Sequence, residues 1–231
     1  MTTSGSAASS QVARGLEEKL RNRKARLGVI GLGYVGLPLA VEFARTGFSV
    51  VGIDLDDRKV ASIEKGESYI PDVPSAELAA VVREGRLKAT TDYAAIADCD
   101  VVDICVPTPL RKTKDPDLSF ILSAAEQVQR YAHPGMLVIL ESTTYPGTTD
   151  ELVLPRLTER GLRVGEDVFL CFSPERVDPG NPQFNTRNIP KVVGGATPVC
   201  AALGAMFYGQ AMEKVVPVRS EEHTSELQSL A

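Results

Sequence analysis

The chain of 231 residues has little of what marks several common classes of protein. Its four cysteines are scattered and form no Cys-x-x-Cys pair, so the sequence indicates neither a zinc site nor a disulfide framework. No stretch approaches the roughly 18 consecutive apolar residues that a membrane-spanning helix needs. Residues 1–10 also lack the apolar core of a signal peptide. We therefore expect a cytoplasmic protein with no metal site and no membrane partner.

Positive charge is scarce as well. The chain has 25 Lys and Arg residues against 30 Asp and Glu residues, a net charge of −5, and no basic run follows Arg26. This balance argues against nucleic acid as a partner. The short basic stretch at 19–26 is interpreted as the solvated face of an N-terminal helix. With 43% hydrophobic and 24% charged residues, the composition is that of a globular protein with a substantial core.

Apolar runs alternate with helix-spaced apolar residues along most of the chain. We predict strands at 27–31, 49–53, 101–105, 136–140 and 168–172, with shorter ones near 87–89, 191–193 and 214–218. We predict helices at about 34–46, 57–65, 75–84, 118–132, 148–160 and 197–208. Residues 1–10 are expected to be disordered, and 12–24 to form a short charged helix with Leu16 and Leu20 on one side. The alternation predicts an α/β fold, a doubly wound parallel sheet of the Rossmann type.

A glycine-rich turn follows the first predicted strand. Gly31, Gly33 and Gly36 form a Gly-x-Gly-x-x-Gly motif that opens a helix, and Asp54 ends the second strand 18 residues after Gly36. This arrangement is typical of a dinucleotide site, in which the helix N-terminus binds a pyrophosphate and the acid accepts the ribose hydroxyls. A carboxylate there would repel a 2′-phosphate, so the sequence predicts binding of NAD rather than NADP.

Three polar loops follow predicted strands at the edge where ligands bind in such a sheet. They begin at Val106, at Glu141 and at Ser173, and they carry hydroxyls, prolines and acids. Each loop alone is explained by turn chemistry and a helix N-cap. Three of them beside a glycine-rich turn favour a functional site.

Four motifs together resemble one enzyme family. They are Gly-Leu-Gly-Tyr-Val-Gly-Leu-Pro from Gly31, Cys-Val-Pro-Thr-Pro-Leu from Cys105, Glu-Ser-Thr-Thr-Tyr-Pro-Gly from Glu141 and Ser-Pro-Glu-Arg-Val-Asp-Pro-Gly-Asn from Ser173. The chain from about 12 to 218 resembles the NAD-binding half of the UDP-glucose/GDP-mannose dehydrogenase family. Within it, the chain looks most like the bacterial UDP-N-acetylglucosamine 6-dehydrogenases.

The resemblance implies oxidation of the C6 hydroxyl of a UDP-sugar to a carboxylate, in two NAD-dependent steps through a cysteine-bound thiohemiacetal and thioester. It also implies a homo-oligomer for the complete enzyme. The residues implied to bind NAD are Gly31, Leu32, Gly33, Tyr34, Val35, Gly36, Asp54 and Lys59 at the adenosine end, and Val106, Pro107, Thr108, Pro109, Leu110, Ser142, Thr143, Thr144 and Glu175 elsewhere.

Thr143 and Glu175 are the implied catalytic pair. The hydroxyl would order a water or the substrate oxygen, and the carboxylate would assist proton transfer. The glutamate suits that role only if burial raises its pKa toward neutrality. Some relatives carry a second glutamate four positions after the one matching Glu175, where this chain has Pro179.

The family's nucleophilic cysteine, in a Gly-Gly-x-Cys-x-Pro motif, would lie after Val218 and is not in this sequence. Instead, residues 219–229 resemble the in-frame translation of a sequencing adapter. We therefore divide the chain into an N-terminal tail and helix at 1–26, a Rossmann domain at 27–218 and a non-native tail at 219–231. We expect the chain as written to bind NAD weakly or not at all, and to turn nothing over.

The glycine motif also occurs in other classes of protein. Hydroxy-acid dehydrogenases share it but often use a histidine as acid or base, and this chain has only two histidines. His133 lies in a turn before a strand, and His223 lies in the suspect tail. A fragment of a 6-phosphogluconate-type dehydrogenase and a non-catalytic NAD-sensing module are likewise compatible with the motif.

Overall fold

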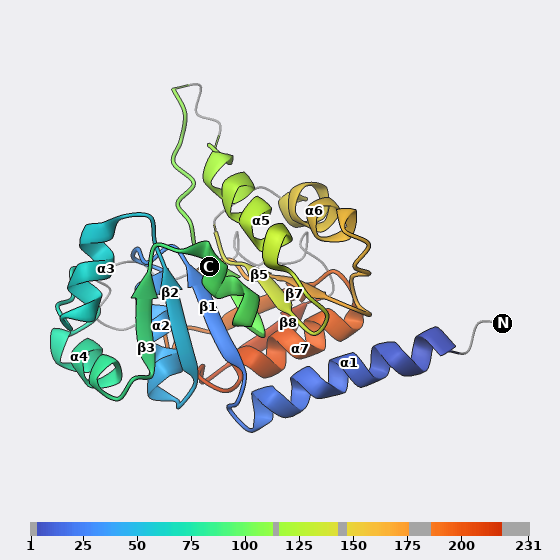
Figure 1. Cartoon of the computed structure of the whole chain (residues 1–231), viewed down its shortest axis with the longest axis horizontal. Helices are drawn as coiled ribbons and strands as arrows, with labels where there is room; N and C mark the ends of the chain where they lie inside the picture. The colour runs from blue at the N-terminus through green and yellow to red at the C-terminus, as the bar shows by residue number, and fades with distance from the viewer. Residues whose placement is uncertain (1–3, 113–115, 143–146, 176–185, 219–231) are drawn as a thin grey trace.

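The computed structural model describes residues 4–112, 116–142, 147–175 and 186–218, shown in Figure 1. Their centre is one eight-stranded sheet in the order β3-β2-β1-β4-β5-β6-β7-β8. The strands are β1 Arg26–Ile30, β2 Ser49–Ile53, β3 Leu87–Thr90, β4 Val101–Ile104, β5 Leu137–Leu140, β6 Phe169–Phe172, β7 Lys191–Gly195 and β8 Val215–Val218. All eight predicted strands are confirmed, with ends that differ by at most two residues.

The predicted doubly wound α/β fold is confirmed, but one pair of strands departs from a purely parallel sheet. β1 to β6 pair in parallel, whereas β7 runs antiparallel to β6, and β8 is parallel to β7. Parallel neighbours need a long crossover, usually a helix, whereas antiparallel neighbours do not. No helix was predicted between residues 172 and 191, which is compatible with the reversal but does not by itself specify the direction of β7.

Helices cover both faces of the sheet (Figure 1). They are α1 Ser4–Arg21, α2 Gly36–Arg45, α3 Asp57–Glu64, α4 Ser75–Arg83, α5 Ser119–Tyr131, α6 Leu154–Glu159 and α7 Pro198–Tyr208, with a 3₁₀ turn at Tyr93–Asp98. The predicted helix 148–160 is confirmed in place but is irregular. A π-helical turn at Thr149–Val153 precedes α6, whose first turn contains Pro155. Proline has no N–H to donate, which interrupts the regular hydrogen-bond ladder there.

The N-terminal helix is longer than predicted. α1 begins at Ser4, so the expected disorder of residues 1–10 is contradicted for 4–10; residues 1–3 lie outside the described part. Leu16 and Leu20 are buried, as predicted, and α1 packs against α7. Burial of these leucines anchors the helix, and the alanines before them propagate it toward Ser4.

Strand side chains alternate between two apolar layers. Val101, Leu137 and Ile139 belong to the layer that includes α2 and α7, whereas Val102 and Val138 belong to the layer that includes α5 and α6. This alternation follows from the two-residue period of a strand. It also places Asp103 and Glu141 on the α7 side, because each is two residues from an apolar residue of that layer.

Candidate functional site

A cavity of about 790 Å³ opens at the carboxyl ends of β1, β2, β4 and β5. It is lined by Ile30, Gly31, Gly33, Tyr34, Val35, Ile53, Asp54, Leu55, Asp56, Lys59, Tyr69, Ile70, Tyr93, Cys105, Val106, Pro107, Thr108, Phe120, Ser123, Glu141 and Ser142. In a doubly wound sheet this edge is where ligands bind. The cavity therefore brings together the glycine-rich turn, Asp54 and two of the three predicted loops.

The three glycines of the motif have different surroundings. Gly31 has φ +91°, and a Cβ there would lie 2.6 Å from the carbonyl oxygen of Cys105. A Cβ on Gly36 would lie 1.8 Å from the carbonyl oxygen of Gly31. Both positions therefore need glycine so that α2 and β4 can pack closely around the turn.

Packing within the protein does not require a glycine at position 33. A Cβ there would meet no atom within 4 Å, and Gly33 lines the cavity. The N-cap of α2 is Val35, whose side chain makes no hydrogen bond to the first turn. An open glycine beside a helix N-terminus fits the close approach of a pyrophosphate, as the sequence predicts for NAD.

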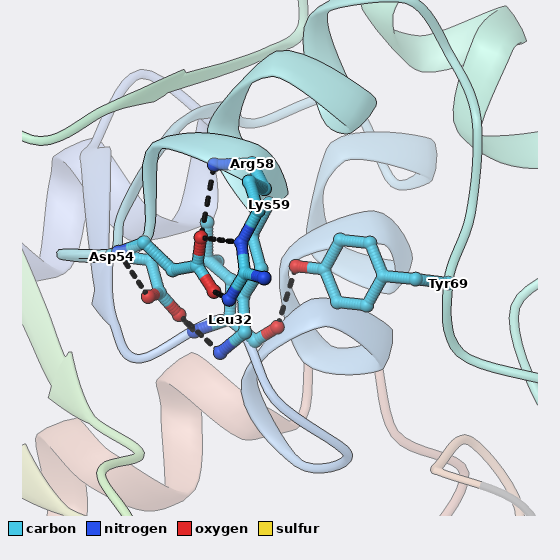
Figure 2. Close-up of polar contacts among 6 residues, drawn as sticks. Leu32, Asp54, Arg58, Lys59 and Tyr69 are labelled. Carbon is cyan, nitrogen blue, oxygen red and sulfur yellow. Dashed lines mark hydrogen bonds and ion pairs between the residues drawn. The ribbon is translucent and has the colours of Figure 1, made fainter.

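Asp54 ends β2 and fastens the glycine-rich turn to it (Figure 2). Its Oδ2 accepts hydrogen bonds from the Leu32 amide at 2.9 Å and from Lys59 Nζ at 2.8 Å, and its Oδ1 accepts one from the Asp56 amide at 3.0 Å. A carboxylate offers about four acceptor positions. Oδ1 is thus the oxygen with capacity left for a ribose hydroxyl, and Lys59 Nζ lies beside it as a donor.

Tyr69 completes this end of the cavity and was missed by the sequence analysis. Its hydroxyl donates to the Leu32 carbonyl oxygen at 2.7 Å, so both backbone groups of Leu32 are held by side chains, as Figure 2 shows. Burial, with the charges of Asp54 and Asp56 nearby, raises the pKa of Tyr69, which keeps the hydroxyl protonated as a donor. Nothing in the local pattern around Tyr69 marks it as part of the site.

The loops after β4 and β5 contribute unequally. Val106, Pro107 and Thr108 line the cavity, whereas Pro109 and Leu110 are not among its lining residues. The Pro109 carbonyl oxygen accepts from the Asp117 amide at 2.8 Å, and Leu110 is exposed. Both therefore belong to the outer part of the loop.

Ser142 lines the cavity, but its hydroxyl is engaged with the backbone. It lies 2.7 Å from the Val106 carbonyl oxygen and 3.3 Å from that of Ile104, so it ties the end of β5 to the end of β4. The predicted Thr143 and Thr144 lie outside the described residues. Of the predicted cofactor residues, Leu32 and Gly36 hold the turn rather than line the cavity, and Glu175 lies elsewhere.

A buried polar cluster lies behind the β4–β5 end of the cavity, on the α7 side. Glu141 is ion-paired with Lys191, and Tyr208 donates a hydrogen bond to Glu141 Oε2 at 2.7 Å. The Tyr208 hydroxyl also lies 3.2 Å from Asp103 Oδ2, and Lys191 Nζ lies 3.2 Å from Glu175 Oε2. We call these five residues the buried cluster; they come from β4, β5, β7, α7 and the end of β6.

Charge in the buried cluster is unbalanced, because three carboxyl groups face one ammonium. Burial raises the pKa of Asp103 to about 6 and that of Glu141 well above its usual range. Burial by itself lowers the pKa of Lys191, but the charges of Glu141 and Glu175 outweigh it and raise that pKa. Lys191 is therefore charged, whereas burial disfavours the charged forms of Asp103 and Glu141.

Side-chain atoms of Asp103, Cys105 and Glu141 lie within 4.8 Å of one another, a spacing that a metal could use. Here the Lys191 ammonium already engages Glu141, and Tyr208 contacts both carboxyls. Burial also raises the pKa of Cys105, so its thiol stays protonated. The arrangement is that of a hydrogen-bonded cluster around a lysine.

Across the described ranges, no helix combines the length and apolar character that crossing a bilayer would take.

Comparison with known proteins identifies the family to which the chain belongs. The family model described as "UDP-glucose/GDP-mannose dehydrogenase family, NAD binding domain" matches residues 25–212. The UDP-N-acetyl-D-glucosamine 6-dehydrogenase of Pseudomonas aeruginosa is 39% identical over 184 residues, which are 79% of this chain and 43% of that protein. The UDP-N-acetyl-D-mannosamine dehydrogenase of Escherichia coli K12 is 38% identical over 194 residues, 80% of this chain and 45% of that protein.

Solved structures of nucleotide-sugar dehydrogenases have a similar fold. The UDP-D-ManNAc dehydrogenase of Pyrococcus horikoshii has a TM-score of 0.81 at 33% identity, covering 86% of this chain and 48% of that one. The NDP-N-acetyl-D-galactosaminuronic acid dehydrogenase of Methanosarcina mazei has a TM-score of 0.83 at 31% identity, covering 93% and 49%. The chain thus spans less than half the length of the curated relatives it matches.

Proposed function

Because the chain belongs to the UDP-glucose/GDP-mannose dehydrogenase family, of which it contains the NAD-binding domain, we propose that it is the NAD-binding part of a UDP-sugar 6-dehydrogenase. The proposed reaction oxidises the C6 hydroxyl of UDP-N-acetylglucosamine to the carboxylate. The observation that carries the proposal is Gly33, which faces open cavity with no packing role in the protein. The named activities of the relatives supply the reaction class.

The proposed NAD contacts follow the cavity. Within the turn from Gly31 to Gly36, the amides of Gly31 and Leu32 already donate to Ile53 and Asp54. The backbone amides from Gly33 onward and the N-terminus of α2 would therefore bind the pyrophosphate. Asp54 and Lys59 would bind the adenosine ribose, and the acid at this position favours NAD over NADP. Residues 106–108, with Ser142 and the predicted Pro109, Leu110, Thr143 and Thr144, would surround the nicotinamide half. Bound NAD supplies the hydride acceptor for the sugar carbon.

The proposed catalytic residues are Thr143 and Glu175. Glu175 follows β6, and its side chain is 10% exposed and paired with Lys191. Its near-burial and its pairing with Lys191 act on its proton affinity in opposite directions. We propose that this carboxylate accepts a proton from water or substrate. We further propose a cytoplasmic homo-oligomer, a Rossmann domain at 27–218 and a non-native tail at 219–231, a segment outside the described residues.

Titration calorimetry with NAD tests the cofactor site, on the protein read from the gene beyond the codon for Val218, because we expect the chain as written to bind NAD weakly or not at all. Gly33→Ala fills the open cradle, so we expect NAD affinity to fall at least about tenfold with the free energy of unfolding nearly unchanged. Gly15→Ala is the matched control, since a Cβ there also meets nothing within 4 Å, on a helix away from the cavity. Equal NAD affinity in wild type and Gly33→Ala would contradict the proposed site.

Turnover needs the gene read beyond the codon for Val218. The extended protein should convert UDP-N-acetylglucosamine to its uronate with NAD, followed as NADH absorbance. UDP-N-acetylmannosamine is the necessary comparison substrate, because relatives of both names have similar identity. Faster turnover of the mannosamine sugar would replace the proposed substrate, and turnover of neither would refute the reaction class.

A further inference from the structure

We propose that Lys191 is the positioning residue for Glu175, holding its carboxylate ionised and oriented at the carboxyl edge of the sheet. The catalytic meaning of this contact rests on the proposed function, because Glu175 is the proposed proton acceptor. The contact itself is a property of the described fold and can be tested without turnover.

The ion pair is almost completely withdrawn from water. The Lys191 side chain is 3% exposed and that of Glu175 is 10% exposed, with Nζ and Oε2 3.2 Å apart. A carboxylate in such surroundings is favoured in its charged form only if an opposite charge lies close by. Lys191 supplies that charge from a different strand.

Strand direction brings the two residues together. β6 and β7 are antiparallel, with Cys171 opposite Gly195 and Phe172 opposite Gly194. Extending this register along both chains puts residue 191 opposite residue 175. Had β7 been parallel to β6, Lys191 would start its strand at the opposite edge of the sheet.

Lys191 cannot easily turn away from this position, because the buried cluster surrounds it. Glu141 on β5 pairs with the same ammonium, and the Tyr208 ring on α7 lies 5.3 Å below it. Tyr208 in turn bridges Glu141 and Asp103. Among the residues that the structure describes, the charged and titratable groups facing Lys191 are Glu141, Glu175, Asp103 and Tyr208, with Cys105 beyond Asp103.

In this arrangement the carboxylates of Glu141 and Glu175 have different roles. Glu141 is fully buried and holds the Lys191 ammonium inside the cluster. Glu175, which follows β6, is the second carboxylate that pairs with the Lys191 ammonium. A general base has to be ionised before it accepts a proton. Lys191 thus keeps a nearly buried carboxylate available for that step.

The test is a ¹³C NMR titration of this chain, labelled at glutamate carboxyls, with the Glu175 signal assigned by its loss in Glu175→Gln. In Lys191→Met we expect the titration midpoint of Glu175 to rise by at least about one pH unit, a tenfold gain in proton affinity. Lys191→Arg, which keeps the charge, should return the midpoint toward wild type. An unchanged midpoint in a folded Lys191→Met chain overturns the proposal.

A second measurement decides the matter if Lys191→Met does not fold. The ¹⁵N signal of the Lys191 ammonium, assigned by its loss in Lys191→Arg, should shift in Glu175→Gln. Glu126→Gln is the matched control, an exposed glutamate on α5. A Lys191 signal that does not respond to Glu175→Gln overturns the proposal. A failure of the protein read beyond the codon for Val218 to bind NAD would overturn the proposed function and leave both NMR results as they stand.

Discussion

Two lysine–carboxylate pairs serve the two ends of the cavity, and they are built in opposite ways. Asp54 and Lys59 are five residues apart, and their side chains are 11% and 34% exposed. Glu141 and Lys191 are 50 residues apart and are 0% and 3% exposed. The first pair is local in sequence and partly exposed to solvent, whereas the second joins distant segments and is buried.

The difference teaches what each pair can do. Water screens the Asp54–Lys59 pair, so it contributes little to stability and remains available to a ligand. The Glu141–Lys191 pair has lost its hydration, so removing one partner leaves an uncompensated charge in the interior. The comparison therefore predicts different effects at the two ends. Variants of the Asp54–Lys59 pair should mainly change ligand binding, whereas variants of the Glu141–Lys191 pair should change stability and proton affinity.

Lys191→Met should have the largest effect on stability. It removes the ammonium that pairs with Glu141 and Glu175, and we expect the free energy of unfolding to fall by about 3–5 kcal/mol. Urea denaturation measures the loss. The double variant Lys191→Met with Glu141→Gln should recover part of it, because fewer buried charges remain. A loss as small as that of Lys59→Met would erase the contrast between the two ends.

The pH dependence of stability should come next. Because the pKa of Asp103 is raised to about 6 in the folded chain, the folded state binds its proton more tightly than the unfolded state. This part of the stability is therefore largest below pH 4 and is lost as the pH rises through about 6. Between pH 4 and pH 7 we expect wild type to lose about 1–3 kcal/mol relative to Asp103→Asn, measured by urea denaturation at each pH. Parallel curves for the two chains would contradict the shifted pKa.

Asp54→Ala should act mainly on binding. It removes three hydrogen bonds that fix the glycine-rich turn and the start of α3. We expect a loss of about 1–2 kcal/mol in stability and a larger proportional loss of NAD affinity, at least about tenfold. Calorimetry with NAD measures the second effect. Glu64→Ala, an exposed acid on the same helix as Lys59, should change neither.

Lys59→Met should have the smallest effect on folding. Its partner Asp54 keeps two backbone hydrogen bonds, and a partly exposed ion pair contributes about 0–1 kcal/mol. We expect the free energy of unfolding to change by less than about 1 kcal/mol. A loss above about 2 kcal/mol in urea denaturation would show that this pair is as structural as the buried one.

Much of the fold could be predicted because its signals are local. The apolar strands, the helix-spaced residues between them and the glycine turn each depend on neighbours within a few residues. Local patterns do not report strand direction, so β7 was expected to be parallel. They also placed the start of the N-terminal helix too late, because the packing of Leu16 and Leu20 on α7 lies far away in the sequence.

In the candidate site, too, residues with a local sequence signal could be predicted and residues brought together by long-range packing could not. Gly33 and Asp54 could be predicted for the cofactor end because a strand, a turn and a helix carry them in a recognisable spacing. Lys59 was predicted there only because the chain resembles the family. Tyr69 and Tyr208 could not, since each meets its partner only after distant segments have packed. An acid inside the apolar run at 101–105 and a lysine before Val192 were the available hints of the buried cluster.

The amino-acid sequence by itself determined the order of strands and helices, the glycine turn and the acid at its far end, because all of these depend on backbone preferences and side-chain periodicity over short stretches. Only the tertiary structure decided the reversal of β7 and the meeting of Lys191 with Glu141 and Glu175. Those depend on which segments pair across the sheet, where burial turns ordinary charged residues into a cluster with shifted proton affinities.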